Sequence, residues 1–218
     1  MSTSITKDLI FYSEVSAFIN SEFLVQNFEF LKNSLRFGEQ ISLTQKTIPY
    51  DRLLGRALLF KALKFLNIKA FDMSQMTYNS TGKPQLKTSP HVNFSISHSN
   101  DIVVCAVSLY NVIGIDIEEV ITVDLYNFKN HFSDSEWELL NYSSNPSLFF
   151  DLWTKKEALL KATGDGLSST LKDIEIPTNR VCYNNTVWTF YKLSIMSNYC
   201  TYFACNNKTS FEIKKLHF

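Results

Sequence analysis

The chain has 218 residues, of which 45% are hydrophobic and 19% are charged, and this composition excludes a disordered chain and a coiled coil. The length is sufficient to bury a hydrophobic core in one or two domains. The formal net charge is zero because 21 Lys and Arg residues balance 21 Asp and Glu residues. A general electrostatic attraction to nucleic acid is therefore excluded, and any anion site must be local.

A cytoplasmic location without a membrane anchor is expected. Residues 1–14 lack the basic region and the apolar core of a signal peptide. The longest apolar stretch, residues 102–117, is interrupted by polar residues and is too short to span a bilayer. The four cysteines form no CxxC pair, and Cys105 lies in an apolar run where a reduced thiol packs as a small hydrophobic side chain.

The first part of the chain is predicted to begin with a strand and continue with two helices. Residues 8–12 are typical of a strand, and residues 21–35 of a helix with Ser21 as its N-cap. Apolar side chains at i, i+3 and i+4 spacing predict a second helix over residues 51–66, capped by Asp51.

From about residue 73 the pattern changes to strands. Residues 80–84 have the composition of a turn. Tyr110 and Asn111 are expected to form a tight connection between the last two of three β-rich runs. These runs cover residues 92–96, 102–109 and 112–118.

Residues 123–163 are predicted to be helical again. Ser133 and Glu136 fit a capping box, and Pro146 suits the first turn of a long helix that ends before Gly164. The remainder, from about residue 173, is rich in Val, Ile, Thr, Tyr and Phe and is expected to return to strands. The chain thus repeats the order helices then strands, which predicts an α+β fold of two halves that meet near residue 110.

Two carboxylates share one face of a predicted strand. Alternate residues of a strand point the same way with Cα atoms about 6.6 Å apart, so Asp116 and Glu118 lie on the face opposite the neighbouring Ile side chains. Gly114 lies on the carboxylate face and is expected to leave space there for a bulky ligand. Such a pair suits Mg²⁺, but an ordinary half-buried strand with a polar outer face is an equal alternative for this motif alone.

Trp153, Glu157 and Lys161 form one stripe of the long predicted helix, at positions i, i+4 and i+8. Glu157 could add a third carboxylate to a metal site, and Lys161 could hold a phosphate or neutralise a leaving group. The alternative is a solvated Glu157–Lys161 ion pair with Trp153 in the core, and the helix in isolation favours that alternative.

The segment Asn93-Phe94-Ser95-Ile96-Ser97-His98-Ser99 runs from a strand into hydroxyl groups and a histidine that can donate hydrogen bonds to phosphate oxygens. The alternative is a strand end with a surface histidine. A Ser/His/Asp hydrolase is disfavoured because the chain has no GxSxG motif.

Three further cations are candidates for anion binding. Gly82-Lys83-Pro84 is a rigid turn that presents a lysine, although most such turns have no further role. Arg52 and Arg56 lie one helical turn apart and could bind an anion together, or they could form the polar face of an amphipathic helix.

These motifs follow one another in an order and spacing that resemble the 4′-phosphopantetheinyl transferases, specifically the longer, pseudo-dimeric Sfp-type branch. The resemblance implies two similar α+β halves related by a pseudo-twofold axis. Residues 1–110 would supply coenzyme A contacts, and residues 111–218 the metal-binding and catalytic motifs. The motifs that carry the resemblance are GKP at 82–84, FSISHS at 94–99, IGIDIE at 113–118 and WTKKEALLKATGDGL at 153–167.

The resemblance implies a transfer reaction that depends on Mg²⁺, with Mn²⁺ as a possible substitute. Such enzymes move the phosphopantetheine arm of coenzyme A to a serine of an apo acyl, aryl or peptidyl carrier protein and release 3′,5′-ADP. Carried over by motif, the metal ligands are Asp116, Glu118 and Glu157. The implied catalytic residues are Glu157 as general base, Lys161 as phosphate contact and Asp116.

The implied coenzyme A contacts are Lys83, Ser97, His98 and Lys161. The family also places a coenzyme-A-binding arginine on or just before the helix matching residues 51–66. Arg56 is the first choice because Gly55-Arg56 is similar to a Gly-Arg step in some relatives, and Arg52 is the alternative. The protein is expected to act as a cytoplasmic monomer whose partners are coenzyme A and an apo carrier protein, without nucleic acid or membrane.

Two other functions use the same residues. A metal-dependent phosphatase or nuclease would activate water with these carboxylates, but it would need more Asp or His ligands and leaves the GKP and SHS segments without a role. A non-catalytic nucleotide- or carrier-binding protein would not need the intact carboxylates. For the transferase, Phe132 and the helix over residues 133–140 are expected to contact the carrier protein.

Overall fold

The fold is α+β, as the sequence predicted, and its elements follow the predicted order. The structure, a computed structural model, describes residues 7–35, 49–68, 76–143, 145–166 and 171–218. The elements up to the middle of the chain are β1 (Lys7–Glu14), α1 (Val15–Ile19), α2 (Glu22–Lys32), α4 (Tyr50–Phe65), β2 (Met76–Tyr78), β3 (Pro84–Leu86), β4 (Asn93–Ser99) and β5 (Ile102–Ser108).

The second part of the chain contains the longest helix. As predicted, a short connection through Tyr110 and Asn111 joins β5 to the first strand of this part. Its elements are β6 (Ile113–Glu119), the 3₁₀ helix η2 (Leu125–His131), α5 (Asp134–Tyr142), α6 (Ser147–Thr163), the 3₁₀ helix η3 (Leu171–Asp173), β7 (Arg180–Tyr183), β8 (Thr186–Lys192), β9 (Tyr199–Cys205) and β10 (Ser210–Lys215).

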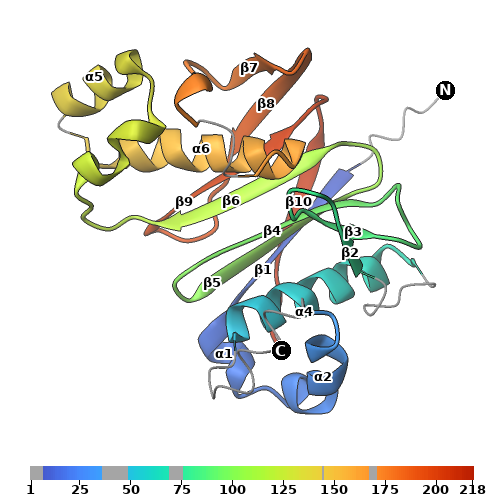
Figure 1. Cartoon of the computed structure of the whole chain (residues 1–218). Coiled ribbons are helices and arrows are strands. Elements are labelled where there is room, and N and C mark those ends of the chain that lie inside the picture. Colours follow the sequence, from blue (N-terminus) through green and yellow to red (C-terminus); the bar gives the residue numbers. More distant parts are fainter. Residues whose placement is uncertain (1–6, 36–48, 69–75, 144, 167–170) are drawn as a thin grey trace.

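Two four-stranded sheets lie between two long helices, so that the layers follow the order helix, sheet, sheet, helix (Figure 1). The first sheet has the order β10-β1-β5-β4 and carries α4, whereas the second has the order β6-β9-β8-β7 and carries α6. A separate hairpin joins β2 and β3. Buried apolar side chains fill the space under each helix and a third layer between the sheets, where Ile113, Ile115 and Ile117 of β6 face β1 and β5.

Most of the predicted helix ends are confirmed. The Ser21 side chain accepts a hydrogen bond from the backbone N–H of Leu24, and Ser133 and Glu136 form the full capping box of α5. Gly164 ends α6 in the left-handed conformation, which glycine adopts without strain. The prediction that Asp51 caps α4 is wrong, because Pro49 occupies the N-cap position and the Asp51 carboxylate instead contacts His98.

The first sheet takes one of its edge strands from the C-terminal end of the chain. β10 pairs in parallel with β1 and so completes the sheet of the first half, although it follows the whole of the second. The Phe218 ring then packs against Phe18 and Phe23 of the N-terminal helices. The division into residues 1–110 and 111–218 stays a prediction, and the structure adds that residues 210–218 lie with the first half.

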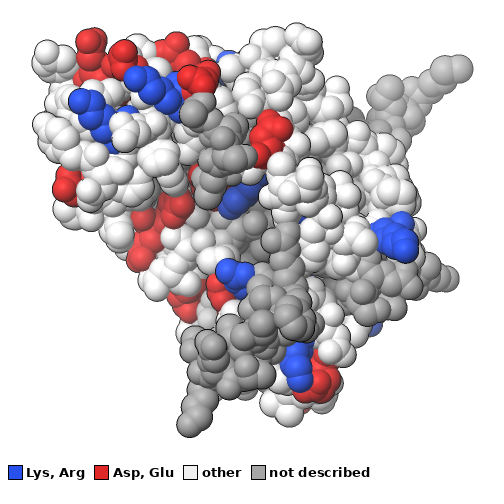
Figure 2. Space-filling model, viewed as in Figure 1, with Lys and Arg blue, Asp and Glu red and all other residues white. Residues whose placement is uncertain are grey.

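Neither positive nor negative charge dominates the face shown in Figure 2, where basic side chains lie scattered among acidic ones. This agrees with the formal net charge of zero. Every helix in the described part of the chain is too short or too polar to cross a lipid bilayer.

Gly114 has a different role from the one predicted. A Cβ atom at this position would lie 2.5 Å from the Ala162 nitrogen and closer still to the Ala158 carbonyl oxygen. The space above Gly114 is therefore filled by the backbone of α6, and it is not a space for a ligand. The missing side chain lets α6 approach β6 closely, which places Glu157 and Lys161 of the helix near Asp116 of the strand.

Replacing Gly114 by Ala is expected to lower the free energy of unfolding by more than about 2 kcal/mol, because the new methyl group would collide with helix backbone that cannot rotate away. Gly55→Ala is the matched control. A Cβ there would approach a side-chain methyl group of Ile96 at 2.8 Å and no backbone atom, and Ala favours the helix, so a smaller loss than for Gly114→Ala is expected. Urea denaturation of both variants measures the difference, and equal losses would contradict this account of Gly114.

Candidate functional site

Three carboxylates and one lysine meet where β6 packs against α6. Asp116 and Glu118 project from the face of β6 that α6 covers, and Glu157 and Lys161 lie one turn apart on the helix. Burial, and then the negative charge of Asp116, raises the pKa of Glu157 to about 7. The same two causes, in the same order, raise the pKa of Glu118. The structure thus brings together carboxylates that are separated by 41 positions in the chain.

Lys161 supplies the positive charge at this cluster. Its Nζ lies 2.6 Å from Asp116 Oδ1 and 2.7 Å from Ser97 Oγ, and the Ser97 hydroxyl donates to the same Asp116 oxygen at 2.8 Å. The sequence left open a solvated ion pair between Lys161 and Glu157. The lysine pairs with Asp116 instead, whose side chain is only 3% exposed.

Two carboxylate oxygens at the cluster lack a hydrogen-bond partner. Asp116 Oδ2 and Glu157 Oε1 are both buried and unpaired. Leaving a charged oxygen buried without a partner costs free energy, and oxygen atoms of this kind are the ligands that Mg²⁺ prefers. The chemistry of these donors therefore fits a divalent cation. Among the described residues, no three His, Cys, Asp or Glu side chains already form a metal-binding group, so these side chains would have to move to enclose the ion.

Glu118 is held by a donor on each carboxylate oxygen. Trp153 Nε1 donates to Oε1 at 3.2 Å, and the Ser99 hydroxyl donates to Oε2 at 3.2 Å. Trp153 thus reaches the strand from α6, whereas Ser99 reaches it from β4. The sequence placed Trp153 on the same helical stripe as Glu157 and Lys161, and it offered the Ser99 hydroxyl only as one of several hydrogen-bond donors to phosphate oxygens.

A cavity of about 360 Å³ opens beside Glu157 and Lys161. Its other walls come from the turn before β3, from β4 and from the end of α6. The lining residues are Thr81, Gly82, Lys83, Pro84, Phe94, Ser95, Ile96, Glu157, Leu160, Lys161, Gly164 and Gly166. Both halves of the chain therefore contribute to one cavity, and the carboxylate cluster lies at its side.

The predicted Gly82-Lys83-Pro84 turn is attached to the C-terminal end of α6. Lys83 Nζ donates to the carbonyl oxygen of Ala162 at 2.6 Å, and the Thr81 hydroxyl donates to that of Gly164. An ammonium group is favourable at the negative end of a helix. Burial nevertheless lowers the pKa of Lys83 to about 8, because desolvation disfavours its charged form.

The remaining predicted coenzyme A contacts lie away from this cavity or have other partners. Ser97 lines no part of it, and its hydroxyl is engaged by Asp116 and Lys161. His98 Nε2 lies 3.2 Å from Asp51, and burial lowers its pKa. The side chain of Arg56, the first choice for the arginine, is buried, donates to the Tyr78 hydroxyl at 3.0 Å and does not line the cavity.

Arg52 is better placed than Arg56 to meet an anion near the cluster. Arg52 is exposed, and both its charge and that of Lys161 lower the pKa of His98. Arg52 and Lys161 are therefore both close enough to His98 to act on its charge.

Sequence reasoning missed the role of Lys156. Its side chain is fully buried and its ammonium group donates to Glu136 Oε2 at 2.5 Å, to the Leu171 carbonyl oxygen at 2.9 Å and to that of His131 at 3.2 Å. Burial lowers the pKa of Lys156, and the hydrogen bond that its ammonium group donates to Glu136 opposes this. Lys156 thus ties α6 to α5 and to both 3₁₀ helices, on the side of α6 away from Asp116.

The prediction that Phe132 contacts a carrier protein is wrong. Its side chain is 1% exposed and lies in an aromatic cluster, with ring centroids 5.7 Å from Phe149 and 6.4 Å from Trp153. Lys156 Nζ also lies 5.2 Å from the centre of its ring. Phe132 therefore belongs to the core that supports α6.

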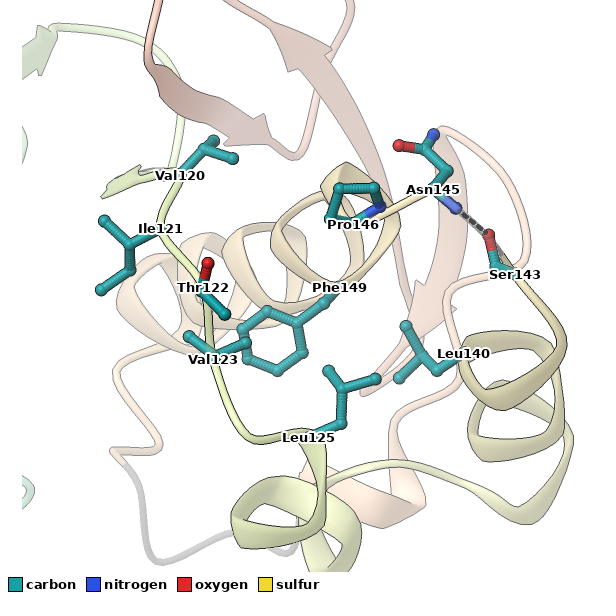
Figure 3. Close-up of a pocket in the computed structure, with 10 residues that line it drawn as sticks. All are labelled: Val120, Ile121, Thr122, Val123, Leu125, Leu140, Ser143, Asn145, Pro146 and Phe149. Atoms are coloured by element: carbon teal, nitrogen blue, oxygen red, sulfur yellow. Dashed lines mark hydrogen bonds between the residues drawn. The ribbon is translucent and has the colours of Figure 1, made fainter.

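An apolar groove lies on the outer side of the same region, between the segment after β6, α5 and the start of α6. Figure 3 shows the Phe149 ring at its floor with Val123, Leu125 and Leu140 around it. The groove has a volume of about 750 Å³. Large apolar side chains are also exposed in this region, namely Ile121, Tyr126, Leu139 and Tyr142.

Comparison with known proteins gives a consistent result. Residues 112–202 match the family model described as the 4'-phosphopantetheinyl transferase superfamily. The chain is 37% identical to 4'-phosphopantetheinyl transferase gsp of Aneurinibacillus migulanus over 135 residues, which cover 60% of this chain and 55% of the relative. It is 42% identical to HetI of Nostoc sp. (strain PCC 7120) over 56% of this chain and 54% of the relative. For Sfp of Bacillus subtilis (strain 168), the identity is 36% over 48% and 49%. The chain spans about half the length of the curated relatives it matches.

Replacing Lys156 by Met is expected to lower the free energy of unfolding by about 3–5 kcal/mol, because the Glu136 carboxylate would stay buried without its cation. The neighbouring Lys155→Met is the matched control. Lys155 is only partly buried and contacts the Tyr202 ring, so a loss within about 1 kcal/mol is expected. Urea denaturation compares the two variants, and adding Glu136→Gln to Lys156→Met should recover part of the loss. Similar losses in both single variants would refute the role assigned to Lys156.

Lys83 is expected to lose its proton near pH 8 in the folded protein and near pH 10.4 in the unfolded chain. Because the folded-state pKa is the lower one, the unfolded chain binds more protons between these values, and the contribution of Lys83 to stability rises with pH across this window. Amine labelling at a series of pH values, followed by mass spectrometry of the Lys83 peptide, measures the midpoint. Urea-unfolded protein is the control, and an identical midpoint in both states would disprove the effect of burial.

Proposed function

Since residues 112–202 match the model of the 4′-phosphopantetheinyl transferase superfamily, we propose that the chain transfers the 4′-phosphopantetheine arm of coenzyme A to a serine of an apo acyl or peptidyl carrier protein. The second product is 3′,5′-ADP. The observation that carries this proposal is the convergence of Asp116, Glu118, Glu157 and Lys161 beside a cavity that both halves line.

The residues of the cluster suit the steps of such a transfer. The serine oxygen forms a bond to the phosphorus that bears the pantetheine arm, and the bond from that phosphorus to the oxygen of 3′,5′-ADP breaks. Glu157 accepts the serine proton, because its Oε1 atom is unpaired. Lys161 is already within hydrogen-bond distance of Asp116 and Ser97, and it can turn its ammonium group to the phosphate oxygens on which charge develops.

A divalent cation, Mg²⁺ or Mn²⁺, is part of the proposal. Asp116, Glu118 and Glu157 would hold it, and the unpaired oxygens of Asp116 and Glu157 support this choice. When bound, the ion supplies positive charge that stabilises the pyrophosphate as its bond breaks. Without such a charge, three neighbouring carboxylates would repel both one another and the phosphates.

Coenzyme A would lie in the cavity between the turn at Lys83 and the end of α6. Lys83 and Lys161 line this cavity, and His98 and Arg52 lie on the adjoining side. Lys83, Lys161 and His98 keep the roles that the family resemblance implied. Ser97 is proposed to act on Asp116 instead of the ligand, and Arg52 replaces Arg56 as the arginine that meets a phosphate group.

The carrier protein would dock on the apolar groove shown in Figure 3. Val120, one of its lining residues, directly follows the strand that bears Asp116 and Glu118, so a partner seated there would be close to the cluster. The exposed side chains of Leu139 and Tyr142 replace Phe132 as the docking residues of α5. A reaction that uses coenzyme A and a newly made carrier is expected in the cytoplasm, and the two halves of one chain can form the cavity without a second copy.

Intact-protein mass spectrometry tests this proposal directly. An apo carrier protein incubated with the chain, coenzyme A and Mg²⁺ should gain the mass of one phosphopantetheine arm, and EDTA should abolish the gain. Asp116→Asn and Glu157→Gln should each lower the rate at least about a hundredfold while circular dichroism stays unchanged.

Glu22→Gln, at an exposed position at the start of α2, is the matched control and should transfer at the wild-type rate. Wild-type turnover in either site variant would reject the assigned roles. Hydrolysis of a simple phosphodiester without any carrier modification would favour the phosphatase or nuclease instead.

A further inference from the structure

Three serines of β4 join the two sheets along their facing edges. The hydroxyl oxygens of Ser95, Ser97 and Ser99 accept hydrogen bonds from the backbone of β6. The three bonds come from the N–H groups of Ile115 at 3.1 Å, Ile117 at 3.4 Å and Glu119 at 2.9 Å. Since β6 is an edge strand, these groups would otherwise lack strand partners on that side. The serines therefore act as a ladder of side chains between two sheets that share no backbone pairing.

The three serines are equivalent toward the backbone but not toward the carboxylates. Ser97 also donates to Asp116, and Ser99 also donates to Glu118 Oε2 at 3.2 Å. Ser95 makes the same kind of contact with β6 and has no carboxylate partner in the described part of the chain. Ser95, which only joins the sheets, can therefore serve as an internal control for Ser97 and Ser99, which also contact an acidic side chain.

Glu118 depends on such orientation more than Asp116 does. Its longer side chain has more rotamers, it lies near the end of β6 and it is only partly buried, whereas Asp116 is short, buried and paired with Lys161. The donors on Glu118 come from two directions, Trp153 on one oxygen and Ser99 on the other. Removing the Ser99 hydroxyl would leave Trp153 alone to define the position of the carboxylate.

We propose that Ser99 is a positioning residue that fixes the Glu118 carboxylate beside Asp116 and thereby sets the affinity of the site for a divalent cation. This inference rests on the proposed function, because it concerns the cation of the same site. Hydrogen-bond partners of metal ligands typically alter metal affinity by about 10–100-fold when they are removed. Ser99 is such a hydrogen-bond partner of Glu118, one of the proposed metal ligands.

The test compares Mn²⁺ binding by four forms of the full chain: the wild type, Ser99→Ala, Ser95→Ala and Ser99→Thr. Mn²⁺ alone is titrated and free Mn²⁺ is measured by electron paramagnetic resonance, without coenzyme A or carrier. Ser99→Ala is expected to raise the Kd for Mn²⁺ about tenfold. Ser95→Ala should leave it within about twofold, although both variants lose one bond of the ladder. Ser99→Thr keeps the hydroxyl and should restore wild-type binding.

Urea denaturation of the same forms shows whether each is folded and whether the two alanine variants lose similar stability. If Ser99→Ala does not fold, Ser99→Val, which has the shape of Thr without the hydroxyl, replaces it in the comparison with Ser99→Thr. An unchanged Kd in Ser99→Ala, or an equal rise in Ser95→Ala, would overturn the inference.

A wild-type chain that binds no Mn²⁺ would overturn both this inference and the proposed metal site. A weaker Kd confined to the variants without the Ser99 hydroxyl would support the inference even where no carrier protein accepts an arm. The two proposals therefore fail separately.

Discussion

The close contact between the backbone of α6 and β6 at Gly114 is the constraint on which the site depends. A strand and a helix that are separated by about thirty residues of chain can place acidic side chains against one another only if nothing large lies between them. Gly114 lies on the same face of β6 as Asp116, two positions before it. The backbone of α6 therefore contacts the backbone of β6 directly beside the acidic cluster. The geometry of the carboxylates is thus determined by packing at a position that carries no functional group.

That packing brings together more negative charge than the protein itself neutralises. Lys161 pairs with Asp116, yet burial and the mutual repulsion of the carboxylates still raise the pKa values of Glu118 and Glu157. Hydrogen bonds from Ser99 and Trp153 satisfy Glu118, whereas one oxygen of Glu157 stays buried and unpaired. Binding of a cation or a proton stabilises a site with such unpaired negative charge, which is the property that a metal-dependent acid–base site requires.

The sequence predicted what local patterns determine. The alternation of Ile113, Ile115 and Ile117 identified the buried face of β6, and the capping box at Ser133 identified the start of α5. Contacts between distant segments carried no such signal. Phe132 was predicted to be a docking residue because an exposed aromatic and a core aromatic look alike in a sequence, and its burial depends on Phe149 and Trp153 across the fold. The serine ladder was missed for the same reason, since its partners lie about twenty residues away on another strand.

The two sides of α6 illustrate how one short segment serves both structure and chemistry. Trp153, Glu157 and Lys161 lie on the side toward β6, as their spacing predicted, while Lys156 points to α5 and is fully buried. A buried ion pair adds little stability compared with an apolar pair of similar shape, but it does specify which groups must meet. Lys156 meets Glu136 and two backbone carbonyls of the 3₁₀ helices, so a rotation of α6 about its axis would break three hydrogen bonds at once. The same rotation would move Glu157 away from Asp116, and the buried lysine therefore fixes the orientation on which the acidic cluster depends.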